Sequence, residues 1–203
     1  MKNINYQNKK KKGFALTEVL LSIAVIVIIG IVAYPLYASS RDAATVEKIR
    51  NEATMVLSSA DTSSKSFRSQ AMSDGQYFDV MKYFEATGQL PEGLTHTGFG
   101  IMGERYAIDG TDWTMEYNFL PDGRSNMWIA AGNDGQKQCI PLFKTFAAMT
   151  KGQLVLNNGT APYYYVSGEP IDTAKLTAAC AVDPYGYGMY TFLFDSSTAV
   201  SYH

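Results

Sequence analysis

The chain has little of what metal centres and catalytic sites are usually made of. Its 203 residues include two cysteines and two histidines. Neither His96 nor His203 has another metal-binding residue type at a useful spacing, which argues against zinc. The sequence also lacks the G-x-x-x-x-G-K-[ST] and G-x-S-x-G motifs, so neither a nucleotide-binding P-loop nor a serine hydrolase is indicated. We therefore expect no enzyme, no cofactor and no metal site.

The chain also lacks an excess of positive charge. Lysine and arginine number 17, aspartate and glutamate 19, and the formal net charge is −2. Five of the lysines fall within residues 1–13, which contain no acid. Removal of that segment would leave 17 − 5 = 12 basic and 19 acidic side chains, a net charge of about −7. General nucleic-acid binding is not expected, because it requires a basic surface.

What the chain does have is one long apolar run near its start. Residues 19–38 contain only five residues that interrupt the aliphatic series: Ser22, Gly30, Tyr34, Pro35 and Tyr37. As a helix, this run is long enough to cross a bilayer core of about 30 Å. The preceding Lys9-Lys10-Lys11-Lys12 block predicts that the amino terminus stays in the cytoplasm and that the downstream chain faces outward.

Glu18 lies just before the apolar run, in the string Gly13-Phe14-Ala15-Leu16-Thr17-Glu18. A carboxylate near the edge of a bilayer costs less than one at the centre of the span, and the amino-terminal end of a helix dipole helps it. Taken alone, Glu18 is therefore an interfacial acid at a helix start. The complete string, with Gly-Phe followed four residues later by Glu inside an apolar helix and behind a basic leader, resembles the type IV pilin signature.

The resemblance implies a set of processing and assembly residues. A prepilin peptidase would remove residues 1–13 by cutting between Gly13 and Phe14, and would methylate the new terminus. Glu18 would then be the fifth mature residue and Pro35 the twenty-second, positions where the family usually has Glu and Pro. The mature length of 203 − 13 = 190 residues is similar to class B pilins, although Phe at the mature start is more typical of class A.

The resemblance further implies a homo-polymer. In it, Glu18 of one subunit would pair with the terminal amine of a neighbour, a group with a pKa near 8 in model peptides. The precursor would wait in the inner membrane, and the product would be an extracellular filament for adherence, aggregation or conjugation. The implied partners are the peptidase, an assembly ATPase, an inner-membrane platform and an outer-membrane secretin. The chain would be the major structural subunit.

Three alternatives remain open at this point. A pseudopilin of type II secretion carries the same amino-terminal signal. A minor, tip-located pilin acting as an adhesin is the second alternative. The third is an unprocessed membrane-anchored sensor or enzyme in which the match is accidental.

Cys139 and Cys180 both lie in the outward part of the chain, and two cysteines allow a single pairing. They would close a loop of about 40 residues, worth roughly 4 kcal/mol in the chain-entropy model. The alternative is two buried free thiols, but an oxidising envelope compartment favours the bond. By resemblance, this disulfide encloses the D-region at the carboxyl end of type IV pilins.

The expected fold is α+β, with a long helix whose first half is hydrophobic and whose second half packs on an antiparallel sheet. We expect a leader at 1–13, a membrane and filament-core helix at 14–40, an amphipathic half at 41–67, a connecting region at 68–110 and a sheet region with the D-region at 111–203. The apolar stripe of the amphipathic half comprises Ala43, Val46, Ile49, Ala53, Val56, Leu57 and Ala60. Gly30 and Pro35 are the predicted points of kinking or melting.

Period-2 patterns and turn residues predict strands at 113–119, 127–131, 153–156, 163–166 and 187–194. Short helices are expected at 77–87, 139–150 and 171–180, and the rest of 68–110 as a mostly surface connection. The last forty-one residues are rich in Tyr and Phe. These rings are expected in the core, with a surface patch for contacts as the alternative.

Overall fold

The computed structural model describes residues 16–100, 103–131, 135–150, 152–158, 162–181 and 190–195. Side chains are described from Tyr37 onward, and in the last strand for Phe192 alone. The chain divides into two units, Met1–Arg41 and Asp42–His203. Of the first unit the structure gives the helical backbone, and the second unit contains the sheet.

Helix α1 is continuous over Leu16–Asp74, so it contains both Gly30 and Pro35. The helix extends beyond the predicted amphipathic half at 41–67, because Phe67 and Ala71 continue the buried stripe. Gly75 follows the helix with φ of 62°. This left-handed conformation is easily reached by glycine and commonly terminates helices.

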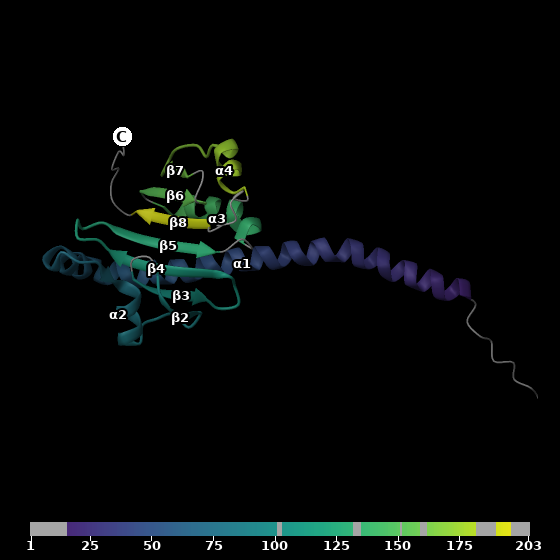
Figure 1. Ribbon diagram of the computed structural model, residues 1–203, viewed down its shortest axis with the longest axis horizontal. Coiled ribbons are helices and arrows are strands. Elements are labelled where there is room, and N and C mark those ends of the chain that lie inside the picture. Colours follow the sequence, from purple (N-terminus) through teal and green to yellow (C-terminus); the bar gives the residue numbers. More distant parts are fainter. Residues whose placement is uncertain are drawn as a thin grey trace, which may run out of the picture. The chain divides into compact units, whose positions relative to one another are not determined.

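Eight strands form one antiparallel sheet within the described residues (Figure 1). They are β1 Phe78–Asp79, β2 Leu94–Phe99, β3 Glu104–Ile108, β4 Trp113–Phe119, β5 Ser125–Ala131, β6 Gln153–Asn157, β7 Tyr163–Val166 and β8 Tyr190–Asp195. Their order is β2-β3-β4-β5-β8-β6-β7, and β1 pairs with β4. The α+β fold and the β4–β5 and β6–β7 hairpins are confirmed.

The last strand of the chain lies inside the sheet. The backbone of β8 pairs on one side with β5, where Phe194 is opposite Met127, and on the other with β6, where the same residue is opposite Leu154. The β6–β7 hairpin is therefore joined to the rest of the sheet through β8. The sheet is therefore continuous only when β8 is paired with both β5 and β6.

The segment 68–110 is richer in structure than predicted. It contains the end of α1, β1, helix α2 Val80–Thr87, β2 and β3, and of these only the α2 region was expected. The missed strand β2 has one buried residue, Leu94, and a register shift between His96 and Gly98. A strand at a sheet edge that is mostly exposed and contains a bulge has no period-2 pattern to detect.

Helix α3 Gln136–Met149 buries Leu142, Phe143, Phe146 and Ala147 on one face, as predicted. Phe192 of β8 contacts both Phe146 at 5.2 Å between ring centroids and Trp113 of β4 at 5.6 Å. A further short helix, α4 Thr173–Ala179, confirms the one expected near 171–180. One hydrophobic core thus lies between one face of the sheet and the helices that cover it.

The carboxyl-terminal aromatic residues are divided between core and surface. Tyr163, Tyr165 and Phe192 are buried, whereas Tyr164 is exposed because it points to the opposite side of β7. The remaining aromatic side chains of the predicted set lie outside the described ones: Tyr185, Tyr187, Tyr190 and Phe194. For the described rings, core is the more common location.

Candidate functional site

The amino-terminal processing residues fall mostly outside the described part of the chain. Gly13 and Phe14 lie among residues 1–15, and of Glu18 the structure gives a helical backbone in the first turn of α1. Within the helices whose residues could be searched, none is long and apolar enough to cross a membrane. The predicted span, 19–38, falls almost wholly on residues whose side chains are not described.

The second half of α1 presents its predicted apolar face to the core. Ile49, Ala53, Val56 and Ala60 are fully or almost fully buried at steps of four, three and four. Three members of the predicted stripe differ in degree: Val46 and Leu57 are partly buried and Ala43 is exposed. This face anchors the helix to the sheet, since full burial of a side chain such as Ile49 or Val56 stabilises the folded state by about 1.5 to 3 kcal/mol.

Glu52 does not belong to the predicted apolar stripe, yet it is buried. The chain at Gly93 passes directly over it, so that a Cβ there would lie 2.0 Å from Glu52 Oε1. Burial raises the pKa of Glu52, and nearby Lys48 partly offsets the effect. The Lys48 ammonium also donates to the carbonyl of Asp109. Together these contacts attach both ends of the β2–β3 hairpin to α1.

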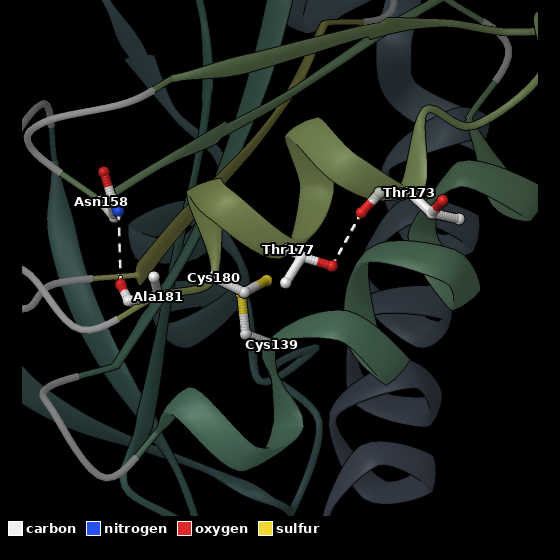
Figure 2. Close-up of a disulfide and its surroundings, with 6 residues drawn as sticks. All are labelled: Cys139, Asn158, Thr173, Thr177, Cys180 and Ala181. Carbon is white, nitrogen blue, oxygen red and sulfur yellow. Dashed lines mark hydrogen bonds between the residues drawn. A yellow bond between two sulfur atoms is a disulfide. The ribbon is translucent and has the colours of Figure 1, made fainter.

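The disulfide between Cys139 and Cys180 is present, with a Cα–Cα distance of 5.8 Å (Figure 2). It joins the start of α3 to the residue that follows α4, and both cysteines are buried. Beside it, the Asn158 side-chain amide donates to the carbonyl of Ala181 at 3.5 Å. The bond thus holds α4 against α3 at the carboxyl-terminal side of the fold.

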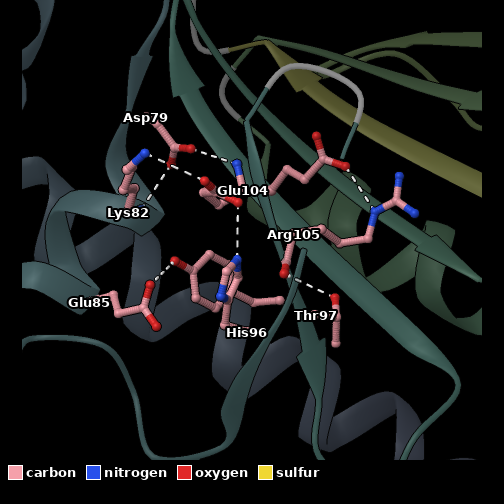
Figure 3. Close-up of polar contacts among 9 residues, drawn as sticks. Asp79, Lys82, Glu85, His96, Thr97, Glu104 and Arg105 are labelled. Atoms are coloured by element: carbon pink, nitrogen blue, oxygen red, sulfur yellow. Dashed lines mark hydrogen bonds and ion pairs between the residues drawn. The ribbon is translucent and has the colours of Figure 1, made fainter. Parts of the chain in front are cut away.

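A second polar cluster links α2 to β3 (Figure 3). Asp79 caps α2 by accepting from the Lys82 backbone amide at 2.9 Å, and its other oxygen accepts from the Glu104 amide at 2.6 Å. Burial raises the pKa of Asp79 despite these hydrogen bonds. Glu104 in turn contacts the Lys82 ammonium at 3.5 Å and His96 Nε2 at 3.0 Å. The hydrogen bond from His96 is the main cause that lowers the pKa of Glu104.

Neighbouring contacts extend this cluster. The Tyr106 hydroxyl donates to Glu85 Oε2 at 2.8 Å, and burial is the main cause that raises its pKa. Arg105 Nε lies 3.2 Å from the buried Glu116 carboxylate. Within the described residues no group of three or more His, Cys, Asp and Glu side chains could hold a metal ion. The cluster is therefore a network of hydrogen bonds and ion pairs that fastens β2, β3 and α2 together.

The turn between β2 and β3 explains two of the glycines. Gly100 N donates to Gly103 O at 2.6 Å, and both glycines lie close to side chains of β4. A Cβ on Gly100 would lie 1.9 Å from Glu116 Oε1, and one on Gly103 would lie 2.6 Å from Asn118 Oδ1. Any larger residue at these positions would have to displace a buried polar side chain.

Sequence analysis missed one feature of this region. An open groove lies between the end of α1, α2 and the β2–β3 hairpin, and three of its residues are exposed aromatics: Tyr77, Tyr83 and Phe99. All three lie in the predicted connecting region 68–110, with Tyr77 and Tyr83 in its expected short helix. The available signal was the presence of several rings in a stretch predicted to face solvent, where large apolar side chains are uncommon.

Comparison with known proteins bears on the amino-terminal signal. The family model of the prokaryotic N-terminal methylation motif matches residues 8–34. Residues 8–34 therefore match the class III signal found in type IV pilins, and this match covers the amino-terminal part of the chain alone. No curated protein and no solved structure was found to match the chain.

Proposed function

We propose that this chain is the major structural subunit of a class B type IV pilus, which polymerises through its amino-terminal helix into a surface filament. The observation that carries the proposal is the methylation motif at residues 8–34. The fold supports it, because α1 runs through both units of the chain, and the first unit would supply the filament core while the α+β unit would supply the surface.

The proposed mechanism of assembly is electrostatic. Cutting after Gly13 removes five lysines and creates an amine at Phe14. This amine can form an ion pair with the Glu18 carboxylate of an adjacent subunit in a region of low dielectric. Removing one partner of such a buried pair costs about 3 to 5 kcal/mol. An offset alignment of neighbouring helices satisfies the carboxylate, so the pair selects one register of packing.

Gly30 and Pro35 have a proposed role in the same step. Both lie within α1, where Pro removes one backbone hydrogen bond and Gly lowers helix propensity by about 1 kcal/mol relative to Ala. In the filament, the segment between Gly30 and Pro35 is where the helix could extend with the smallest loss of helical stability. Extension there would change the spacing of outer domains without disturbing the Cys139–Cys180 region.

The proposal fixes the kinds of partner. A prepilin peptidase acts on Gly13 and Phe14, and an assembly ATPase, an inner-membrane platform and an outer-membrane secretin carry the subunit from the inner membrane to the cell surface. Most contacts of the mature protein would be with identical subunits. The filament would serve adherence, aggregation or conjugation.

The test is intact-mass measurement of the chain from cells with an active prepilin peptidase. The expected product lacks residues 1–13 and carries one added methyl group on Phe14, and cells without the peptidase provide the matched control. Retention of residues 1–13 in the presence of the enzyme would refute the proposal.

The pseudopilin and minor-pilin alternatives are separated by counting subunits in purified fibres. A major subunit is the main protein of a long surface fibre, whereas a minor tip pilin is present in trace amounts. The disulfide-closed outer domain favours the pilus over a secretion pseudopilin. Trace copy number would overturn the proposal that this is the major subunit while leaving the processing intact.

A further inference from the structure

Three of the four aromatic rings that are exposed in the described part of the outer domain lie at one groove. Eight large hydrophobic side chains are exposed among the described residues, and three of them, Tyr77, Tyr83 and Phe99, line this groove. Phe99 is the most exposed of the eight, at 76%. Isolated surface apolar residues are ordinary, but a cluster of rings at one depression indicates a contact with a ligand or partner.

The groove has a floor that is already held in place. Tyr83 contacts Phe67 edge-on at 5.0 Å between ring centroids and Phe78 at 6.0 Å, and Phe67 and Phe78 are stacked at 4.7 Å. Because these rings are packed against one another, the half-exposed Tyr83 loses little conformational entropy when a ligand covers it. The volume of the groove is about 520 Å³, within the range of small-molecule sites.

The charged side chains of the groove are three carboxylates, Asp74, Asp79 and Glu104, and one basic residue, Lys82. Lys82, the one basic residue of the lining, is 3.5 Å from Glu104, and that carboxylate also contacts His96. Both oxygens of Asp79 accept backbone amide hydrogen bonds. An anionic ligand would thus meet no cation that lacks a carboxylate partner, whereas carboxylate oxygens can accept hydrogen bonds from the hydroxyls of a neutral ligand.

Uncharged hydrogen-bonding groups stand beside the rings. Gln70 and Gln76 line the groove with exposed carboxamides, each of which offers donors and acceptors. Asp74 accepts from the Ser73 hydroxyl at 2.9 Å through one oxygen. Aromatic faces next to amide and carboxylate groups match a sugar ring, whose C–H face stacks on the aromatic ring while its hydroxyls hydrogen-bond at the edge.

We propose that this groove binds a neutral saccharide of one or two pyranose rings. Phe99 and Tyr77 supply the stacking faces, and Gln70, Gln76 and Asp74 bond to the hydroxyls. The site lies in the outer domain and uses none of the processing residues, so it stands whether or not the chain forms a filament.

The test is saturation-transfer NMR and titration on the full-length chain in a zwitterionic detergent without a sugar headgroup. The probes are glucose, galactose, mannose, N-acetylglucosamine, N-acetylgalactosamine and their β-linked disaccharides. Choline and N-acetylneuraminic acid are the cationic and anionic comparison ligands. At least one neutral sugar is expected to bind at millimolar concentration, more tightly than either charged ligand.

Two groove variants and one control locate the binding. Phe99→Ala and Tyr77→Ala are each expected to weaken binding about 3- to 10-fold, the loss expected for one aromatic contact. Since Phe99 and Tyr77 are exposed, their removal leaves the core intact. Tyr164→Ala removes an equally exposed ring from β7, away from the groove, and is expected to bind like the unaltered chain.

Three results would overturn the proposal. The first is no binding of any neutral sugar at about 50 mM, far above the Kd of a millimolar complex. The second is tighter binding of choline or N-acetylneuraminic acid than of every neutral sugar. The third is sugar binding that is unchanged in both Phe99→Ala and Tyr77→Ala, which would place the contact elsewhere.

Discussion

Removing the Cys139–Cys180 bond is expected to lower the free energy of unfolding by about 4 kcal/mol. The cysteines are 41 positions apart, and the bond restricts the unfolded chain over that length. The closed loop contains β6, β7 and α4, which reach the rest of the sheet through β8. For a protein of this size, 1 kcal/mol shifts Tm by about 2 to 4 °C, so Tm should fall by about 8 to 16 °C.

The measurement is thermal unfolding of the full chain in detergent, followed by tryptophan fluorescence. Trp113 is a suitable reporter because it is buried and lies 5.6 Å from Phe192 of β8. The variant is Cys139→Ala with Cys180→Ala, and the matched control is the unaltered chain under reducing conditions, which keeps both sulfur atoms in the core. The control should reproduce most of the decrease in Tm.

Comparing the alanine variant with the reduced chain separates the effect of the covalent bond on the unfolded chain from the effect of packing by the two sulfur atoms. If the alanine variant is less stable than the reduced chain, the difference measures the space left by the two sulfurs. A decrease in Tm of less than about 2 °C in both the alanine variant and the reduced chain would refute the reasoning. It would mean that the disulfide adds little restriction to the unfolded chain.

The remaining predictions concern assembly, pH dependence and the core. Glu18→Ala should leave the Tm of the outer domain unchanged and abolish fibres seen by electron microscopy, with Glu18→Asp as the charge-retaining control; normal fibres from the alanine variant would remove the charge-pairing mechanism. Glu104 has a folded-state pKa below its ordinary value of 4.5, so its ion pairs add stability above that pH and lose it as the pH falls through the lowered value. The Tm difference between the unaltered chain and Glu104→Gln should therefore be present at pH 7 and close under strongly acidic conditions, and a constant difference would contradict this. Phe143→Ala should destabilise the fold by about 3 to 5 kcal/mol, because the ring is fully buried and stacked 5.0 Å from Tyr163; chemical denaturation checks this, and a loss below about 1 kcal/mol would show that the surrounding rings fill the space.

Several elements were predictable because their signals are local. Residues 113–119 alternate apolar and polar side chains, residues 163–166 are all Tyr or Val, which favour strands, and the face of α3 follows a period of 3.6. Each such pattern is contained in a short window, so the neighbouring chain does not alter it. The amino-terminal motif is likewise contiguous.

The region 68–110 shows where local signals fail. The strand β2 buries one side chain, and β1 is two residues long. Both exist because of what they pair with: β1 lies beside Phe119 and Asn118 of β4, and β2 lies beside β3. Such short or exposed strands are stabilised by non-local hydrogen bonds, which leave no periodic pattern in the sequence.

The burial of Glu52 has the same origin. On a helical wheel it adjoins the apolar stripe of α1, and the sequence gives no sign that the chain at Gly93 covers it. The groove is a further example, because Tyr77, Tyr83 and Phe99 come from separate parts of the chain that meet only after folding. Neither the covering segment nor the meeting of the rings could have been derived from spacing.

The sequence by itself determined the signal at 8–34, the long helix, the two hairpins and the single pairing available to Cys139 and Cys180, because each depends on residue type and spacing along the chain. Only the tertiary structure decided that β8 lies between β5 and β6, that Glu52 is covered, and that three aromatic rings share one groove. The physical reason is range: propensity and periodicity act over a few residues, whereas strand order and burial are set by contacts between segments far apart in the sequence.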